Sequence, residues 1–172
     1  MHASQRPQSN EFDPYYQGYI NQVERDHFIH ALQNQKASSE AFWLSIPEDR
    51  WEYAYAPDKW TIKEILLHII DTERVFAYRA LRISRNDLTP LPGFDQNDYA
   101  LYSEANSRSV ASLIDEYLAV RESSILLFSS MSEGALLRLG TANNAPCSPR
   151  ALGFIIAGHE NHHLRILRER YL

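Results

Sequence analysis

Hydrophobic side chains recur at helical spacing in four separate stretches of this chain. The sharpest start belongs to residues 61–85, where Thr61 is placed as an N-cap and Glu64, three residues later, completes a capping box. The apolar stripe of this segment consists of Ile65, Ile69, Phe76, Ala80 and Ile83. Further leucines and isoleucines widen the stripe almost all round, so the pattern predicts a helix in the centre of the fold.

Three more segments show the same period. Residues 26–45 stop just before Pro47, and residues 109–130 carry their apolar side chains roughly on one side. A fourth helix is expected over residues 148–170, because Ser148 followed by a proline is a favoured helix start. No stretch between these segments alternates with the period of two that is typical of strands. The sequence therefore predicts an all-α fold, a four-helix bundle.

Glycine and proline concentrate in the connections between these helices. Residues 86–107, between the second and third helices, are too rich in Pro, Gly and Asn for a packed element and are expected to lie across a bundle end. Residues 14–23 form a short lead-in to the first helix. Residues 1–12 carry almost nothing to bury and are predicted to be a loose N-terminal arm. The remainder, residues 13–172, is expected to be a single domain.

Composition and charge narrow the function classes. Hydrophobic residues make up 44% of the chain, which is enough for a core, and no apolar run approaches the length of about 20 residues that spans a membrane. The formal charge of −5 and the lack of a basic cluster argue against a nucleic-acid partner. A single cysteine, Cys147, and a polar N-terminus indicate a cytoplasmic protein.

The fourth predicted helix places two histidines on its apolar side. On a helical wheel of about 100° per residue, His163 falls in the same apolar stripe as His159. His162 lies about 60° to the other side, towards Arg165 and Glu169. Two imidazoles one turn apart on one face can bind a single metal ion, but they can equally be neutral core residues held by hydrogen bonds.

A third histidine favours the metal site. His68 is the only other histidine well inside a predicted apolar helix, on the edge of its stripe. His27 and His30 lie in the first turns of a helix and are expected to face solvent, and His2 belongs to the arm. We therefore predict that His68 and the histidine pair of the fourth helix come together and hold a divalent metal ion.

Three segments carry a more specific signal. They are KWTIKEILLHIIDTER (59–74), PGFDQNDYA (92–100) and GHENHHLRIL (158–167). Together they resemble the DinB-like (damage-inducible) metalloproteins, and the resemblance extends from about residue 19 to residue 171. It implies a four-helix bundle with a three-histidine metal site, whose ligands fall by position on His68, His159 and His163.

A rival motif occupies the same helix. His159, Glu160 and His163 spell HExxH, the motif of zinc proteases in which the glutamate is the general base. The third ligand of such proteases commonly comes from well downstream, yet only nine residues follow His163, and only Glu169 among them could bind a metal. The predicted fold also has no strand to hold a peptide. We therefore expect no protease and take Glu160 as a solvated residue or one that orients a ligand.

Three neutral imidazoles would leave a bound ion its full charge and an open position, which is typical of catalytic sites. Such an ion lowers the pKa of bound water towards about 7 and deprotonates a bound thiol. Imidazole suits zinc, nickel, iron and copper, of which we favour zinc and nickel. The resemblance implies either a metal-dependent hydrolase of a small molecule or an S-transferase with a low-molecular-weight thiol as co-substrate. It also suggests a homodimer.

A non-catalytic, metal-stabilised or dimerising bundle is the alternative to an enzyme. DNA binding is suggested only by the family's name, and the acidic balance opposes it.

Several residues near the predicted ligands allow two interpretations. Glu64 and Asp71, one turn on either side of His68, could orient its imidazole. Alternatively, Glu64 serves only the capping box and Asp71 is simply solvated. Arg79 could bind an anionic substrate group or pair with a carboxylate. Cys147 lies near the start of the fourth helix, where a thiol pKa can be lowered. Tyrosines that could line the mouth of the site or simply pack are Tyr15, Tyr16, Tyr19, Tyr99 and Tyr102.

Overall fold

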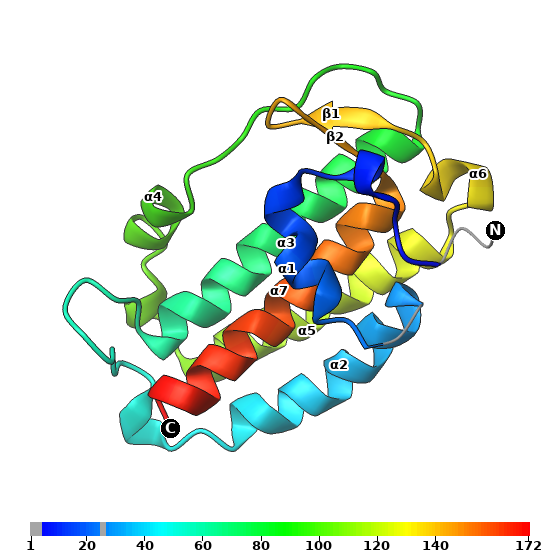
Figure 1. Ribbon diagram of the computed structural model, residues 1–172. Coiled ribbons are helices and arrows are strands. Elements are labelled where there is room, and N and C mark those ends of the chain that lie inside the picture. The colour runs from blue at the N-terminus through cyan, green and yellow to red at the C-terminus, as the bar shows by residue number, and fades with distance from the viewer. Residues whose placement is uncertain (1–4, 25–26) are drawn as a thin grey trace.

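The computed structural model describes residues 5–24 and 27–172, and four long helices form its framework (Figure 1). They are α2 (Phe28–Leu44), α3 (Ile62–Ser84), α5 (Val110–Ser129) and α7 (Pro149–Arg170). Each agrees with its predicted segment to within two residues at both ends, although residue 26, the predicted start of the first helix, lies outside the described residues. The prediction of an all-α four-helix bundle is confirmed.

Side chains that satisfy free backbone N–H groups define where three of these helices begin. Thr61 accepts a hydrogen bond from the N–H of Glu64, and the Glu64 carboxylate accepts one from the N–H of Thr61, so the predicted capping box is present. Ser109 caps α5. Ser148 caps α7 through the N–H of Ala151, with a proline in the first helical position as predicted.

The four helices are not all packed against their neighbours in the sequence. Helix α3 packs against α5 and α7, and α2 packs against the same two helices, so the consecutive pair α2 and α3 occupies opposite corners of the bundle. The connection between α3 and α5 is long, as predicted, but it contains α4 (Gln96–Leu101) and the 3₁₀ turn η4 (Ala105–Ser107). None of the described helices is long and apolar enough to cross a membrane.

A small β-hairpin precedes α7, and the sequence pattern did not reveal it. Strands β1 (Gly140–Ala142) and β2 (Ala145–Cys147) pair antiparallel. Asn143 and Asn144 join them with φ values of 51° and 60°, which suits a tight hairpin turn. Strands of three residues are too short to show a period of two. The short helix α6 (Glu133–Leu136) and the 3₁₀ turn η3 (Glu48–Arg50) complete the connections.

The N-terminal segment is packed onto the bundle. It forms η1 (Ser9–Glu11), η2 (Pro14–Tyr16) and α1 (Gln17–Asn21), and Figure 1 shows α1 lying over α7. Residues 1–4 of the predicted loose arm lie outside the described residues, but Glu11 and Phe12 are buried. Glu11 forms a buried ion pair with Arg150, so the end of the predicted arm belongs to the packed domain.

Two apolar clusters fill the bundle, and a buried polar layer lies between them. The cluster at the hairpin end includes Phe28, Leu32, Phe128 and Phe154, and the other cluster includes Trp43, Ile62, Leu66 and Leu113. Each long helix contributes one residue to the polar layer, which consists of Gln35, Glu73, Arg121 and Glu160. The Arg121 guanidinium is fully buried and lies 2.8 Å from Glu73 and 2.7 Å from Glu160.

Candidate metal centre

Three histidine side chains meet where α3 and α7 lie side by side. His68 comes from α3, and His159 and His163 come from consecutive turns of α7. The Nε2 atom of His159 lies 3.0 Å from Nε2 of His68 and 3.1 Å from Nε2 of His163. His68 and His159 are buried, and His163 is partly buried. The structure therefore brings together the three histidines that the sequence selected.

Burial keeps these imidazoles neutral. It lowers the pKa of His68 to about 4, and it lowers the pKa values of His159 and His163 well below the usual range, with repulsion between the neighbouring rings adding to the effect. Neutral imidazoles have nitrogen lone pairs to offer at pH 7, which is the protonation state that a metal ligand needs.

The donor set fits a divalent ion. A neutral imidazole nitrogen has either one hydrogen or one lone pair, so Nε2 of His159 can make only one good hydrogen bond with its two neighbours. Tetrahedral zinc–nitrogen bonds of about 2.0–2.1 Å would hold pairs of nitrogens about 3.3 Å apart. The observed separations of 3.0 and 3.1 Å are close to this value. A cation among the three nitrogens would therefore satisfy all of them.

Neither carboxylate suggested by the sequence orients His68. The Glu64 carboxylate is engaged by the Thr61 N–H and by the Asn106 amide, and Asp71 lies 3.6 Å from Arg74. Instead, the Thr72 hydroxyl lies 3.5 Å from Nδ1 of His68. The Trp60 ring packs against the His68 ring with centroids 4.7 Å apart. Packing and one hydroxyl therefore position this imidazole.

Glu160 points away from the histidines, into the polar layer. It is fully buried, accepts a hydrogen bond of 2.6 Å from the Tyr117 hydroxyl and pairs with Arg121. The expectation that Glu160 is solvated or orients a ligand is wrong, because its carboxylate is used to join α5 and α7. The same contacts leave it unable to act as the general base of an HExxH protease.

The other described histidines lie outside the cluster, and His2 lies outside the described residues. His162 is a neighbour of His163, but its ring packs edge-on against Tyr19 at a centroid distance of 5.3 Å. The preference for His163 over His162 therefore agrees with the structure. His27 and His30 stack on each other with centroids 4.3 Å apart.

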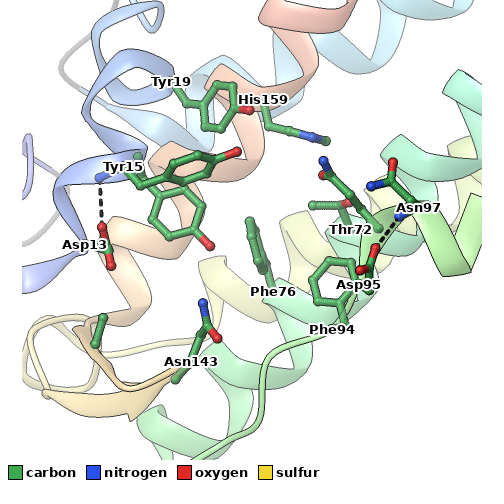
Figure 2. Close-up of a pocket in the computed structure, with 14 residues that line it drawn as sticks. Asp13, Tyr15, Tyr19, Thr72, Phe76, Phe94, Asp95, Asn97, Asn143 and His159 are labelled. Carbon is green, nitrogen blue, oxygen red and sulfur yellow. Dashed lines mark hydrogen bonds between the residues drawn. The ribbon is translucent and has the colours of Figure 1, made fainter. Parts of the chain in front are cut away.

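A cavity of about 380 Å³ opens onto His159 (Figure 2). Its aromatic lining consists of tyrosines of η2 and α1, Phe76 of α3 and Phe94 of the long connection. Of the tyrosines suggested by the sequence, Tyr15, Tyr16 and Tyr19 line this cavity, and Tyr99 and Tyr102 are not among its lining residues. Polar lining residues that the sequence analysis missed are Asp13, Asp95, Gln96, Asn97 and Asn143.

A second, smaller cavity borders His163. It has a volume of about 220 Å³ and is lined by His163 together with the aromatic residues Tyr55, Trp60 and Tyr171. Asn97 lines both cavities. The histidine cluster can therefore be approached along two routes.

Arg79 fits neither of its two proposed roles. Its guanidinium is buried, donates a hydrogen bond of 2.8 Å to the carbonyl oxygen of Pro92 and lies over the rings of Phe76 and Phe94. Arg79 therefore fastens the long connection to α3 next to the aromatic residues of the cavity.

Cys147 also differs from its expected state. It lies on β2, next to the cap of α7, but it is buried, and burial raises the pKa of its thiol to about 11. The suggested lowering of the thiol pKa by the helix start is wrong, because the loss of hydration outweighs it.

Comparisons with known proteins agree with this architecture. The sequence matches the family model of the DinB superfamily over residues 31–167. The fold is similar to that of YfiT from Bacillus subtilis, with a TM-score of 0.73 over 92% of this chain and 91% of that chain, at 11% sequence identity. YfiT is described as a probable metal-dependent hydrolase with an unusual four-helix bundle topology. No curated protein matches the sequence.

Proposed function

The chain belongs to the DinB superfamily, and on this basis we propose that it is a metal-dependent hydrolase of a small molecule. In this proposal His68, His159 and His163 are the ligands of one divalent ion, with zinc or nickel favoured. The observation that carries the proposal is the convergence of three neutral Nε2 atoms beside a cavity. The description of YfiT as a probable metal-dependent hydrolase supports it.

The residues around the cluster suit hydrolysis. When bound, a divalent ion with an open position would supply Lewis acidity and acidify water. The cavity at His159 gives a substrate access to this position. Tyr19 lies edge-on to His159 at a centroid distance of 5.4 Å. Burial and a hydrogen bond with Tyr15 raise its pKa, so its hydroxyl stays protonated beside the cluster.

Metal binding and hydrolysis can be tested together. We expect the purified protein to bind one Zn²⁺ or Ni²⁺ per chain and to hydrolyse simple esters, with activity lost on chelation and restored by the metal. His68→Ala should weaken metal binding more than the roughly 10–100-fold that loss of an outer partner costs. His162→Ala, one residue from a proposed ligand, is the matched control and should bind metal normally. Unchanged activity after complete chelation would refute the proposal.

A small-thiol S-transferase is a second candidate, and the second cavity favours it. A thiol and an electrophile could approach the histidines by way of His159 and His163 respectively, whereas hydrolysis needs only one organic substrate. Mass spectrometry of a reaction that contains the loaded protein, a small thiol and an electrophile would separate the two activities. A thioether product supports the transferase, and a hydrolysis product unaffected by the thiol supports the hydrolase. The cytoplasmic location and the homodimer remain predictions.

A further inference from the structure

We infer that the cavity at His159 accepts a small organic cation, an amine or quaternary ammonium compound whose ester or amide bond reaches the histidines. The inference deepens the proposed function, because it names the class of substrate. The recognition of the cation, however, depends on the cavity walls and not on the reaction. It can therefore be tested by binding alone.

Aromatic rings form much of the cavity lining. Tyr15 and Tyr16 are edge-on to each other with centroids 5.1 Å apart, and Tyr16 is edge-on to Phe76 at 5.9 Å. Tyr19 and Phe94 extend the aromatic lining on either side. The electron-rich faces of such rings attract a cation, and clusters of them are the usual means of holding a quaternary ammonium group.

Two carboxylates also line the cavity. Asp13 and Asp95 come from segments far apart in the sequence, yet Figure 2 shows them on opposite sides of one cavity, with His159 above both in this view. The Oδ1 atom of Asp13 accepts a hydrogen bond from the N–H of Tyr15, and Oδ1 of Asp95 accepts one from the N–H of Asn97. Within the described residues neither aspartate forms an ion pair. Their charge is therefore available to a ligand.

The charges of the cavity lining disfavour an anionic substrate. Among the described residues that line this cavity there is no lysine or arginine. Arg79 is not a lining residue, and its guanidinium lies over the rings of Phe76 and Phe94. It donates a hydrogen bond to the Pro92 carbonyl and also hydrogen-bonds to Tyr16. A phosphate or carboxylate away from the histidines would thus meet two carboxylates and no lining cation to compensate them. A cationic group there would be stabilised by both.

Choline and 3,3-dimethylbutan-1-ol provide the test, because they have nearly the same shape and differ in charge. Their binding to the metal-loaded protein would be measured by calorimetry, and hydrolysis of their acetate esters would be followed separately. We expect choline to bind about tenfold more tightly, the factor that corresponds to about 1.4 kcal/mol of cation–π and charge interaction. Equal binding of the two alcohols, or no binding of either, would overturn the inference.

Asparagine substitutions test whether Asp13 and Asp95 cause the preference for choline. Asp13→Asn and Asp95→Asn remove a charge but preserve the helix caps, since asparagine caps as well as aspartate. Each should reduce the preference for choline by about threefold, a typical effect of one exposed charge pair. Asp98→Asn, exposed on the same helix as Asn97 but outside the cavity lining, should not change it. A preference that survives both cavity substitutions contradicts the assignment.

Failure of the proposed hydrolase and failure of the inferred substrate class would give different results. If choline binds preferentially but neither ester is hydrolysed, the proposed hydrolase is wrong and the cation site stands. If the neutral ester is hydrolysed as well as the cationic one and the two alcohols bind equally, the hydrolase stands and the inferred substrate class is wrong.

Discussion

At the scale of single residues, burial determines which reactive groups are available. Cys147 has a position that would activate a thiol, but its side chain is buried and its pKa is raised to about 11. At pH 8 only about one thiol in a thousand would be ionised. We expect a thiol reagent to label the native protein very slowly at pH 8, faster as the pH rises towards 11, and rapidly after denaturation. Fast labelling of the native protein at pH 8 would contradict this description of the site.

Arg121 is the residue on which the polar layer depends. It is the cation of the layer, and it lies between the buried carboxylates of Glu73 and Glu160. Arg121→Met should lower the free energy of unfolding by about 3–5 kcal/mol, because it leaves two buried carboxylates without a neighbouring cation.

Chemical denaturation would measure this loss. The control is Arg165→Met, which removes an exposed ion pair with Glu169 and should cost less than about 1 kcal/mol. Similar costs for the two substitutions would show that the polar layer does not stabilise the bundle.

At the scale of elements, the docking of α1 onto α7 depends on a glycine. A Cβ atom at Gly158 would lie 1.9 Å from the carbonyl oxygen of Tyr19, so only glycine allows the two helices to approach this closely. Gly158→Ala should displace α1 and lower the free energy of unfolding by about 1–3 kcal/mol. Gly18→Ala, on the exposed side of α1 with no atom within 4 Å, should leave stability unchanged or raise it slightly. Denaturation curves of the two variants should therefore shift in different directions or by clearly different amounts.

The sequence predicted the elements whose ends carry local signals. Thr61, Ser109 and Ser148 each cap a long helix at the expected place. The helical wheel placed His163 rather than His162 beside His159, and these are the histidines that cluster in the structure. The hairpin was missed because its strands have three residues each, and its remaining signal was the Asn143–Asn144 pair at the turn.

The cavity was only partly predictable, because residues distant in the sequence form it. The tyrosines near the N-terminus were candidates for lining the site, but the contact that brings them there joins Tyr19 to Gly158. Asp13 and Asp95 have the local signature of helix caps, and only the folded chain shows that they face one cavity. Glu160 was misjudged because its partners, Tyr117 and Arg121, come from another helix.

At the scale of the whole molecule, a metal ion would connect α3 to α7 and thereby stabilise the bundle. At a free metal concentration of about 100 times Kd the gain is about 2.7 kcal/mol, provided that the unfolded chain does not bind the ion. A chain of this size gains roughly 2–4 °C in Tm per kcal/mol. We therefore expect zinc or nickel to raise Tm by several degrees in a concentration-dependent way. The increase should disappear in His68→Ala and persist in His162→Ala, and an equal increase in both variants would indicate non-specific binding.

His68 and His159 are 91 residues apart in the sequence, and their side chains meet only when α3 and α7 have docked. Closing a loop of this length is entropically costly and is a slow kind of step in chain collapse. The visible absorption of Co²⁺ in a tetrahedral site would therefore appear late during refolding, after the helical circular dichroism signal has formed. Metal binding by the three histidines would then report when α3 and α7 dock during the assembly of the bundle, independently of any substrate.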